Sequence, residues 1–99
     1  MPAFVISDVR FLDQEAVEAY RRRAAVSIAH YGGRYLVRGG AIERLEGPWD
    51  PKIIIIVEFP DMDRARSWYR SPECAAALEF RDRAISRSLI LVEGIAQTA

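Results

Sequence analysis

Cysteine and histidine, the residues that most often build disulfides and metal sites, are nearly absent from this chain of 99 residues, which has one of each. A lone cysteine cannot form a disulfide within the chain, so the fold has to depend on its packed core. His30 and Cys74 are too far apart in sequence for the usual short spacing of zinc ligands, which leaves only a site shared by two chains. We therefore expect no metal and no dedicated cofactor.

An excess of charge of one sign is also missing, because 14 basic residues balance 14 acidic ones. Nucleic-acid binding relies on clustered basic residues, so we expect no nucleic-acid partner. The one basic run, Arg21, Arg22 and Arg23, follows Glu15 and Glu18 within a predicted helix. We interpret this run as a solvated helix face, and a contact surface for a partner is the alternative.

Long apolar runs are absent as well, and we expect no membrane-spanning segment. The first residues carry no basic segment of the kind that opens a secretory signal. Together with a single free thiol, this indicates a cytoplasmic protein. The length suits one domain over residues 1–99.

Hydrophobic residues make up 51% of the chain, enough for a real core. Runs rich in β-branched residues predict strands, and Pro60 ends the most apolar of them, which contains Ile53 to Val57. Because that run has no polar alternation, we expect it to be a central strand that is buried on both faces. The four predicted strands cover residues 3–10, 34–38, 52–59 and 88–93.

Two helical regions separate these strands. Asp13 is placed to cap the first helix, and glycines at 32 and 33 end it. Asp61 is placed to cap the second helix, and Ser71 with Pro72 restarts it, so that it continues to about residue 83. The glycine pair at 39 and 40 predicts a hairpin turn into a short strand over residues 41–46, before a proline-containing loop over 47–51.

This order of elements predicts an α+β fold: a ferredoxin-like βαββαβ antiparallel sheet with two helices on one face. Three strands carry large apolar residues at both parities, so the face that the helices leave open would expose an apolar patch. We therefore expect a homodimer packed sheet face to sheet face. The alternative is a monomer in which residues 39–51 fold over the open face.

A small-molecule site is expected between the sheet and the helices. Histidine is the residue type most often used as a general base, so His30 is our candidate catalytic base, and surface packing at the end of the helix is the alternative interpretation. The candidate ligand-binding residues are Tyr35, Arg38, Trp49, Trp68 and Arg81.

Each of these candidates also has a structural interpretation. Trp68 can be core packing, Trp49 can cover the dimer seam, and the two arginines can form surface salt bridges. Cys74 lies near a predicted helix start, where a thiol can be reactive, or it is a buried inert thiol.

The sequence resembles the domain-of-unknown-function 1330 family over almost its whole length. The motifs that carry the resemblance are Tyr-Gly-Gly-Arg-Tyr-Leu-Val-Arg-Gly-Gly at 31–40, Leu-Glu-Gly at 45–47, Val-Glu-Phe-Pro at 57–60, Ala-Arg-Ser-Trp-Tyr-Arg-Ser-Pro-Glu at 65–73, Arg81 and Leu-Val-Glu-Gly at 91–94. The resemblance implies a ferredoxin-like subunit of the dimeric α/β-barrel superfamily, and it implies no particular reaction. Cys74 stands where members of that family usually carry tyrosine, so a role built on that tyrosine would not transfer.

Two functions are compatible with these observations. The first is a small homodimer that binds or converts a small apolar, aromatic or carbonyl-containing molecule without a dedicated cofactor. The second is a non-enzymatic binding or regulatory module that acts through the surface of the dimer. A pocket with convergent polar groups distinguishes the first from the second.

Overall fold

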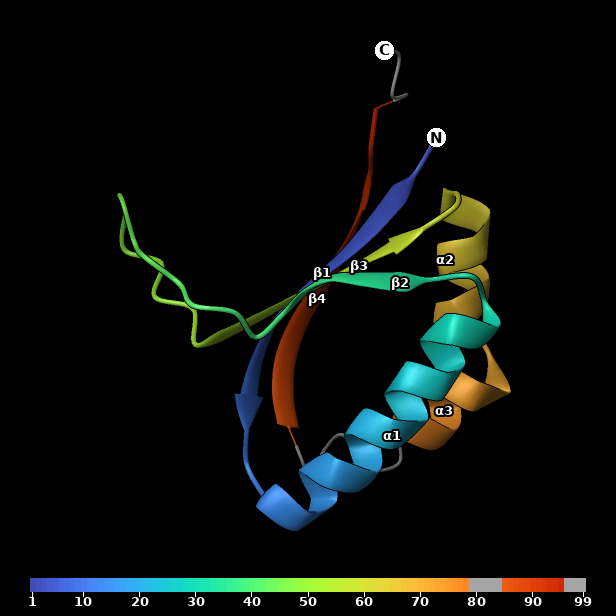
Figure 1. Ribbon diagram of the computed structural model, residues 1–99, viewed down its shortest axis with the longest axis horizontal. Helices are drawn as coiled ribbons and strands as arrows, with labels where there is room; N and C mark the ends of the chain where they lie inside the picture. The colour runs from blue at the N-terminus through green and yellow to red at the C-terminus, as the bar shows by residue number, and fades with distance from the viewer. Residues whose placement is uncertain (79–84, 96–99) are drawn as a thin grey trace.

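The computed structural model describes residues 1–78 and 85–95, which form four strands and three helices (Figure 1). Their order along the chain is β1 (Ala3–Phe11), α1 (Gln14–His30), β2 (Arg34–Arg38), β3 (Ile53–Phe59), α2 (Met62–Tyr69), α3 (Pro72–Leu78) and β4 (Ile85–Glu93).

The four strands form one antiparallel sheet in the order β2-β3-β1-β4. Strands β1 and β3 are central, as their apolar sequences predict. The strand order and the helices between the strands confirm the predicted α+β, ferredoxin-like fold.

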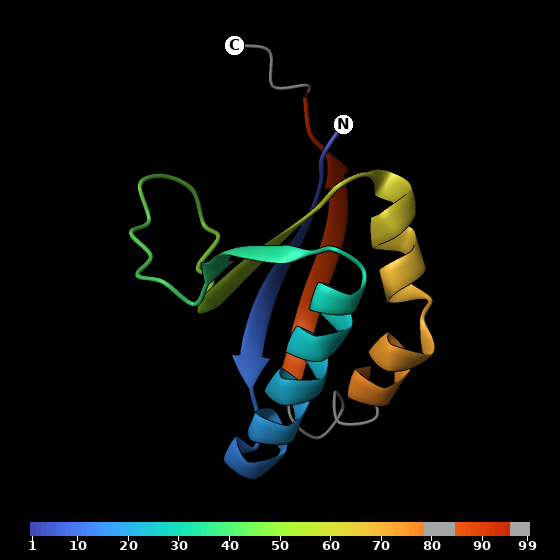
Figure 2. The same cartoon turned by 45° about the vertical axis from the view of Figure 1, so that its right-hand side comes forward.

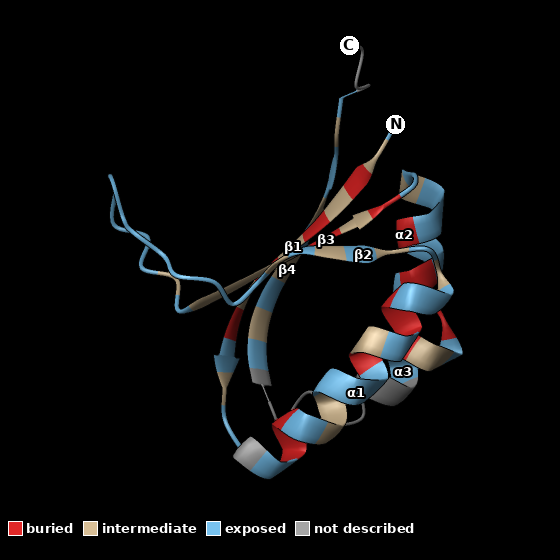
Figure 3. Cartoon of the chain, in the orientation of Figure 1, coloured by how far each residue is buried: buried red, intermediate tan, exposed pale blue. Residues whose placement is uncertain are grey.

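The three helices of the described residues lie on one side of the sheet, and the start of β1 lies beside the end of β4 (Figures 1 and 2). Alternate residues of β1 face the helices and are buried, namely Ala3, Val5, Ser7 and Val9. Buried positions of α1 and α2 face the same layer (Figure 3). The centre of this core joins Val57 and Phe59 of β3 to Trp68 of α2.

The predicted helix starts are confirmed by their hydrogen bonds. Asp13 Oδ1 accepts the backbone N–H of Glu15 at 3.0 Å, and Asp61 Oδ1 accepts that of Arg64 at 2.7 Å. Ser71 Oγ accepts the backbone N–H of Cys74 at 3.0 Å, which begins α3. Helix α1 ends at His30, and Gly32 follows with a φ of +79°, a conformation that favours glycine.

The prediction of a strand over residues 41–46 is wrong. The backbone N–H of Gly39 still bonds to the carbonyl of Ile54, and beyond it the chain leaves the sheet as an irregular segment. We call residues 40–52 the arm, and it projects on the side opposite the helices (Figures 1 and 2). A strand needs a neighbour to pair with, and the arm leaves β2 without a neighbour on its outer edge.

The predicted start of the last strand also differs. Strand β4 begins at Ile85 and not at Ser88, because its pairing with β1 continues to Phe11. The predicted helix end at residue 83 lies outside the described residues.

The second face of the sheet is apolar and has no helix over it in the described part of the chain. Its exposed residues include Ile90 and Val92 of β4, at 56% and 41% exposure. The arm touches this face through Trp49, whose Nε1 donates a hydrogen bond to Asp8 Oδ2 at 3.1 Å. A hollow of about 560 Å³ remains between the arm and the sheet, so the arm does not seal the open face.

None of the helices in the described ranges is both long and apolar enough to cross a membrane.

Candidate functional site

A hollow of about 440 Å³ lies between α2 and the strands β1 and β4, on the side of the sheet that carries the helices. This volume is within the range of sites that hold small molecules. Its apolar wall consists of Val5, Ala65, Trp68, Leu89 and Leu91. The hollow therefore offers an apolar body of one small molecule a place to pack, as predicted for a pocket between the sheet and the helices.

The polar wall of this hollow is mostly arginine. Arg66 comes from α2, Arg70 is the residue that directly follows α2 and caps its end, and Arg87 comes from β4. Arg87 pairs with Val9, so it stands on the buried face of the sheet in line with Leu89. Among the described residues no carboxylate lines the hollow.

The three guanidinium groups differ in what holds them. Arg87 is half-buried, and its Nη1 donates a hydrogen bond to the Tyr20 hydroxyl at 2.7 Å, with the guanidinium 5.9 Å from the centre of that ring. Arg66 Nη1 lies 3.3 Å from Asp63 Oδ1 at the surface. The Arg70 side chain forms no hydrogen bond or ion pair with any residue in the described ranges. Only Arg66 therefore has a carboxylate partner within the part of the chain that the structure describes.

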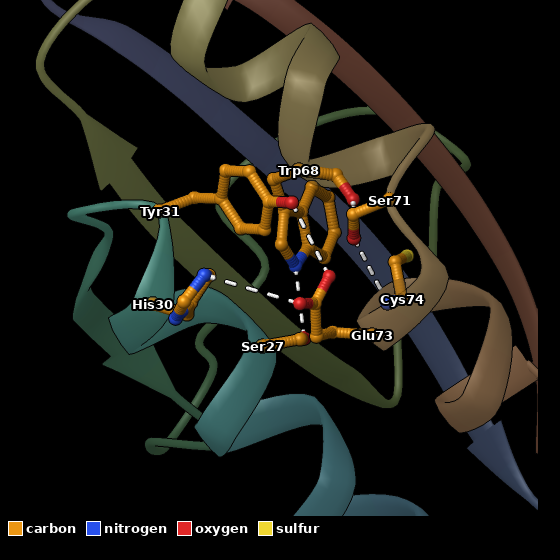
Figure 4. A network of polar contacts seen from close by, with 7 residues as sticks. All are labelled: Ser27, His30, Tyr31, Trp68, Ser71, Glu73 and Cys74. Atoms are coloured by element: carbon orange, nitrogen blue, oxygen red, sulfur yellow. Dashed lines mark hydrogen bonds and ion pairs between the residues drawn. The ribbon is translucent and has the colours of Figure 1, made fainter.

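A second group of polar contacts joins α1 to the junction of α2 and α3 (Figure 4). We call it the interhelix network, and it consists of Ser27, His30, Tyr31, Trp68, Ser71, Glu73 and Cys74. Trp68 Nε1 donates to Ser27 Oγ at 3.0 Å, and Ser27 Oγ donates to the carbonyl of Ala24 at 2.8 Å. Ser71 Oγ donates to the carbonyl of Trp68 at 2.6 Å, so the buried polar atoms of the network are satisfied.

The outer part of the interhelix network is centred on Glu73. The Tyr31 hydroxyl donates to Glu73 Oε2 at 3.2 Å, and His30 Nε2 lies 3.9 Å from Glu73 Oε1. A hydrogen bond from its own backbone N–H lowers the pKa of Glu73 against the opposing effect of burial, and Tyr31, His30 and Ser71 lower it further. Glu73 is therefore a carboxylate that ties the end of α1 to the start of α3.

The predicted site residues do not all meet at one place. Trp68 is buried and lines the hollow, so it serves both core packing and the pocket wall. His30 has a side chain 63% exposed and belongs to the interhelix network, not to the lining of the hollow. Trp49 lies on the arm, across the sheet from the hollow. Arg81 lies outside the described residues.

Tyr35 and Arg38 lie together on β2. The Arg38 guanidinium stacks 4.3 Å from the centre of the Tyr35 ring. Burial raises the pKa of Tyr35, and Arg38 opposes that change. Neither residue lines the hollow beside α2.

Cys74 is buried in the core at 2% exposure. Its backbone N–H is bonded to Ser71, which places it in the first turn of α3. Burial agrees with the interpretation of Cys74 as an apolar core residue.

Sequence reasoning missed Arg66, Arg70 and Arg87. The spacing of four between Arg66 and Arg70 was a usable signal, because residues four apart share a helix face. Arg87 shares its parity with Leu89 and Leu91, but the predicted strand began one residue too late to include it. Groups of three or more histidine, cysteine, aspartate or glutamate residues that could hold a metal ion do not occur within residues 1–78 and 85–95.

Solved structures of the same fold come from several bacteria. A protein of unknown function from Rhodopseudomonas palustris has a TM-score of 0.77 at 22% identity, covering 97% of this chain and 84% of that chain. SnoaB from Streptomyces nogalater, a cofactor-independent oxygenase, has a TM-score of 0.67 at 15% identity, with coverage of 97% and 95%. A dimeric protein of unknown function with a ferredoxin-like fold from Bacteroides fragilis has a TM-score of 0.55 at 14% identity, with coverage of 94% and 96%.

At these identities the likeness establishes the fold alone. None of the curated proteins matches the sequence. The model of one family, described as Domain of unknown function (DUF1330), matches residues 2–95, and the chain belongs to that family.

Proposed function

We propose that this protein is a homodimer that binds a small molecule with an apolar body in the hollow between α2 and β4. The observation that carries the proposal is the hollow itself, which combines an apolar wall with polar groups converging from two elements. Binding of this kind uses Trp68 and Leu89 as packing surface and the adjoining arginines to orient the molecule.

The open face of the sheet supports the pairing of two chains. Six of its apolar residues are Phe4, Ile6, Ile54, Ile56, Ile90 and Val92. Covering several hundred Å² of such surface contributes on the order of 10 kcal/mol before the cost of association, at about 25 cal/mol per Å². The protein from Bacteroides fragilis with this fold is described as dimeric, which agrees with the proposal.

The arm adds to this pairing surface. Leu45 is 89% exposed and Trp49 is 61% exposed, although both are large and apolar. Together with Ile42 they line the other hollow, the one of about 560 Å³ between the arm and the open face of the sheet. A second copy packed on that sheet would cover these side chains, which supports the interpretation of Trp49 as part of the seam.

Conversion of the bound molecule is the enzymatic form of the proposal. The oxygenase from Streptomyces nogalater has the same fold and acts without a cofactor. In this chain His30 is separate from the lining of the hollow, so we assign it no step there. Acid–base chemistry at His30 stays a prediction, and unchanged turnover in His30→Ala would contradict it.

The alternative of a regulatory module also stays a prediction. Within the basic run of α1, the Arg21 guanidinium lies 4.7 Å from the centre of the Phe11 ring, and its Nη1 lies 3.8 Å from Glu18. Charge reversal at Arg21 to Arg23 would test this alternative by loss of a bound partner.

A titration with an uncharged probe tests the proposed binding. The protein has two tryptophans, so nitrogen-15 labelling gives two indole N–H signals, one from Trp68 in the hollow and one from Trp49 on the arm. We expect naphthamide to move the Trp68 signal in a saturable way and to leave the Trp49 signal in place.

The variant Tyr69→Ala sharpens this titration. Tyr69 lines the hollow and is 46% exposed, so its removal should leave the core intact. We expect it to weaken naphthamide binding by about threefold or more, because an aromatic wall is lost. A Trp68 signal that does not respond to naphthamide in the wild-type protein would contradict the proposed function.

A further inference from the structure

We propose that the molecule held in the hollow is an organic anion, a carboxylate carried on an apolar ring or chain. This inference rests on the proposed function and adds the chemical class of the ligand. It starts from the lining of the hollow, where three arginines stand beside an apolar wall and no carboxylate occurs among the described lining residues.

Arg87 has no carboxylate partner among the described residues. Arg87 is half-buried between β4 and α1, and the hydrogen bond that its Nη1 donates goes to a hydroxyl, that of Tyr20, and not to a carboxylate. No carboxylate in the described ranges lies within ion-pair distance of this guanidinium. A partly buried cation is stabilised by an anion that can reach it, and a ligand carboxylate at this position would be such an anion.

Arg87 and Arg70 both have N–H donors that no described residue uses. Tyr20 engages one terminal nitrogen of Arg87, and a guanidinium has five N–H donors in a fixed fork, so donors remain for a carboxylate. Arg70 has its guanidinium free of described partners, and it caps the end of α2, four residues after Arg66. Two sides of the hollow, α2 and β4, can therefore hold one carboxylate between them.

The apolar wall of the hollow favours an organic carboxylate over inorganic phosphate. Val5, Trp68, Leu89 and Leu91 contribute no charge to the lining, and the Trp68 indole N–H is already bonded to Ser27. These side chains would pack against a ring or an alkyl chain and would leave a bare phosphate unsupported. The hollow thus fits an anion with a polar end and an apolar body.

Matched probes test the charge of the ligand. Naphthoate and naphthamide have the same ring system and differ in charge, and inorganic phosphate has charge without a ring. We expect calorimetry to show naphthoate binding about tenfold more tightly than naphthamide, since a charge-assisted hydrogen bond is lost in the amide. Phosphate at the same concentrations should neither bind detectably nor displace naphthoate.

Variants then assign the effect to the arginines. Arg70→Gln removes an exposed guanidinium without breaking a described contact, and we expect it to weaken naphthoate about fivefold to tenfold with little change for naphthamide. Arg87→Lys keeps the charge and loses the fork, so naphthoate binding should fall while naphthamide binding stays. Arg64→Gln is the matched control, because Arg64 is an exposed arginine of α2 that does not line the hollow.

The outcomes separate this inference from the proposed function. Equal affinities for naphthoate and naphthamide, or equal losses in Arg70→Gln and Arg64→Gln, would overturn the inference and leave the binding function standing. Binding of neither naphthalene probe would overturn both. Phosphate that binds as tightly as naphthoate would show a general anion site and would also overturn the inference.

Discussion

The side chain of Trp68 is part of both the hydrophobic core and the wall of the hollow. Its ring packs 5.4 Å from the centre of the Phe59 ring in the core and also closes one side of the hollow. Its indole N–H is held by Ser27 of α1, so the ring cannot turn without leaving a buried donor unpaired. The orientation of this wall of the hollow is therefore set by α1, which packs on the other side of Trp68.

Glu73 gives the protein a predictable response to acid. Its pKa in the folded state lies below that of the unfolded chain, because its own backbone N–H and the neighbouring Tyr31 and His30 favour the carboxylate. The carboxylate then stabilises the fold above the unfolded pKa, near pH 4.3, and that contribution is lost as the pH falls through the folded pKa. We expect Glu73→Gln to be less stable than the wild type at neutral pH and to approach it in acid.

Urea denaturation at about pH 7 and about pH 3 checks this expectation, since the two values lie on either side of the ordinary glutamate pKa. Glu43→Gln on the arm is the control, because Glu43 is exposed and remote from the interhelix network, and its difference from the wild type should not change with pH. If the loss of stability of Glu73→Gln relative to the wild type were larger at acid pH than at neutral pH, this would contradict a lowered pKa of Glu73.

The junction between α1 and β2 depends on Gly33, because there is no room there for a side chain. A Cβ added at Gly33 would lie 2.8 Å from Ile28 Cγ2 and 2.8 Å from Phe59 Cε1, both in the core. We expect Gly33→Ala to lower the free energy of unfolding by about 1–3 kcal/mol through overpacking. Thermal or urea denaturation measures the loss.

Gly40→Ala is the matched control at the start of the arm. A Cβ at Gly40 would meet nothing within 4 Å, so the same substitution should change stability by about 0.5 kcal/mol or less. Equal losses in the two variants would show that the close packing at Gly33 is not what limits this junction.

Much of the element order could be predicted because local chemistry decides it. Asp13, Asp61 and Ser71 precede runs with helical spacing, and each accepts a backbone N–H of the helix that follows. The central place of β3 followed from its isoleucine run, but the expected burial on both faces is not seen in the described chain, where Ile53 to Ile56 are only partly buried.

The arm and the arginine wall could not be predicted so easily, because they depend on distant partners. The sequence of residues 41–46 suits a strand, but among the described residues no strand lies on the outer edge of β2 for them to pair with. Arg87 looked like a residue of a loop, yet pairing with Val9 draws it into β4 and turns it toward the helices. Pairing between strands far apart in sequence thus decided both features.

The whole molecule presents two apolar surfaces on one sheet, and the proposed homodimer needs the one that lacks helices. Ile90→Asp places a charge on that open face, at a residue already 56% exposed in the single chain. We expect the single-chain fold to persist and the dimer to weaken by about a hundredfold or more, because a buried unpaired charge is costly at an interface.

Analytical ultracentrifugation with circular dichroism separates association from folding in this variant. Val26→Asp is the control, since Val26 is 68% exposed on α1, on the helix side of the molecule. A wild-type protein that sediments as an 11.2 kDa particle at micromolar concentration would contradict the homodimer.

Strand β1 serves both surfaces through consecutive residues: Val5 lines the hollow and Ile6 pairs with Ile90 on the open side. Side chains that line the hollow and side chains of the open face therefore alternate along β1. Inserting or deleting a single residue there would invert the segment, sending pocket side chains outward and seam side chains inward. Point substitutions can alter either surface by itself, whereas a change in the length of β1 alters both at one stroke.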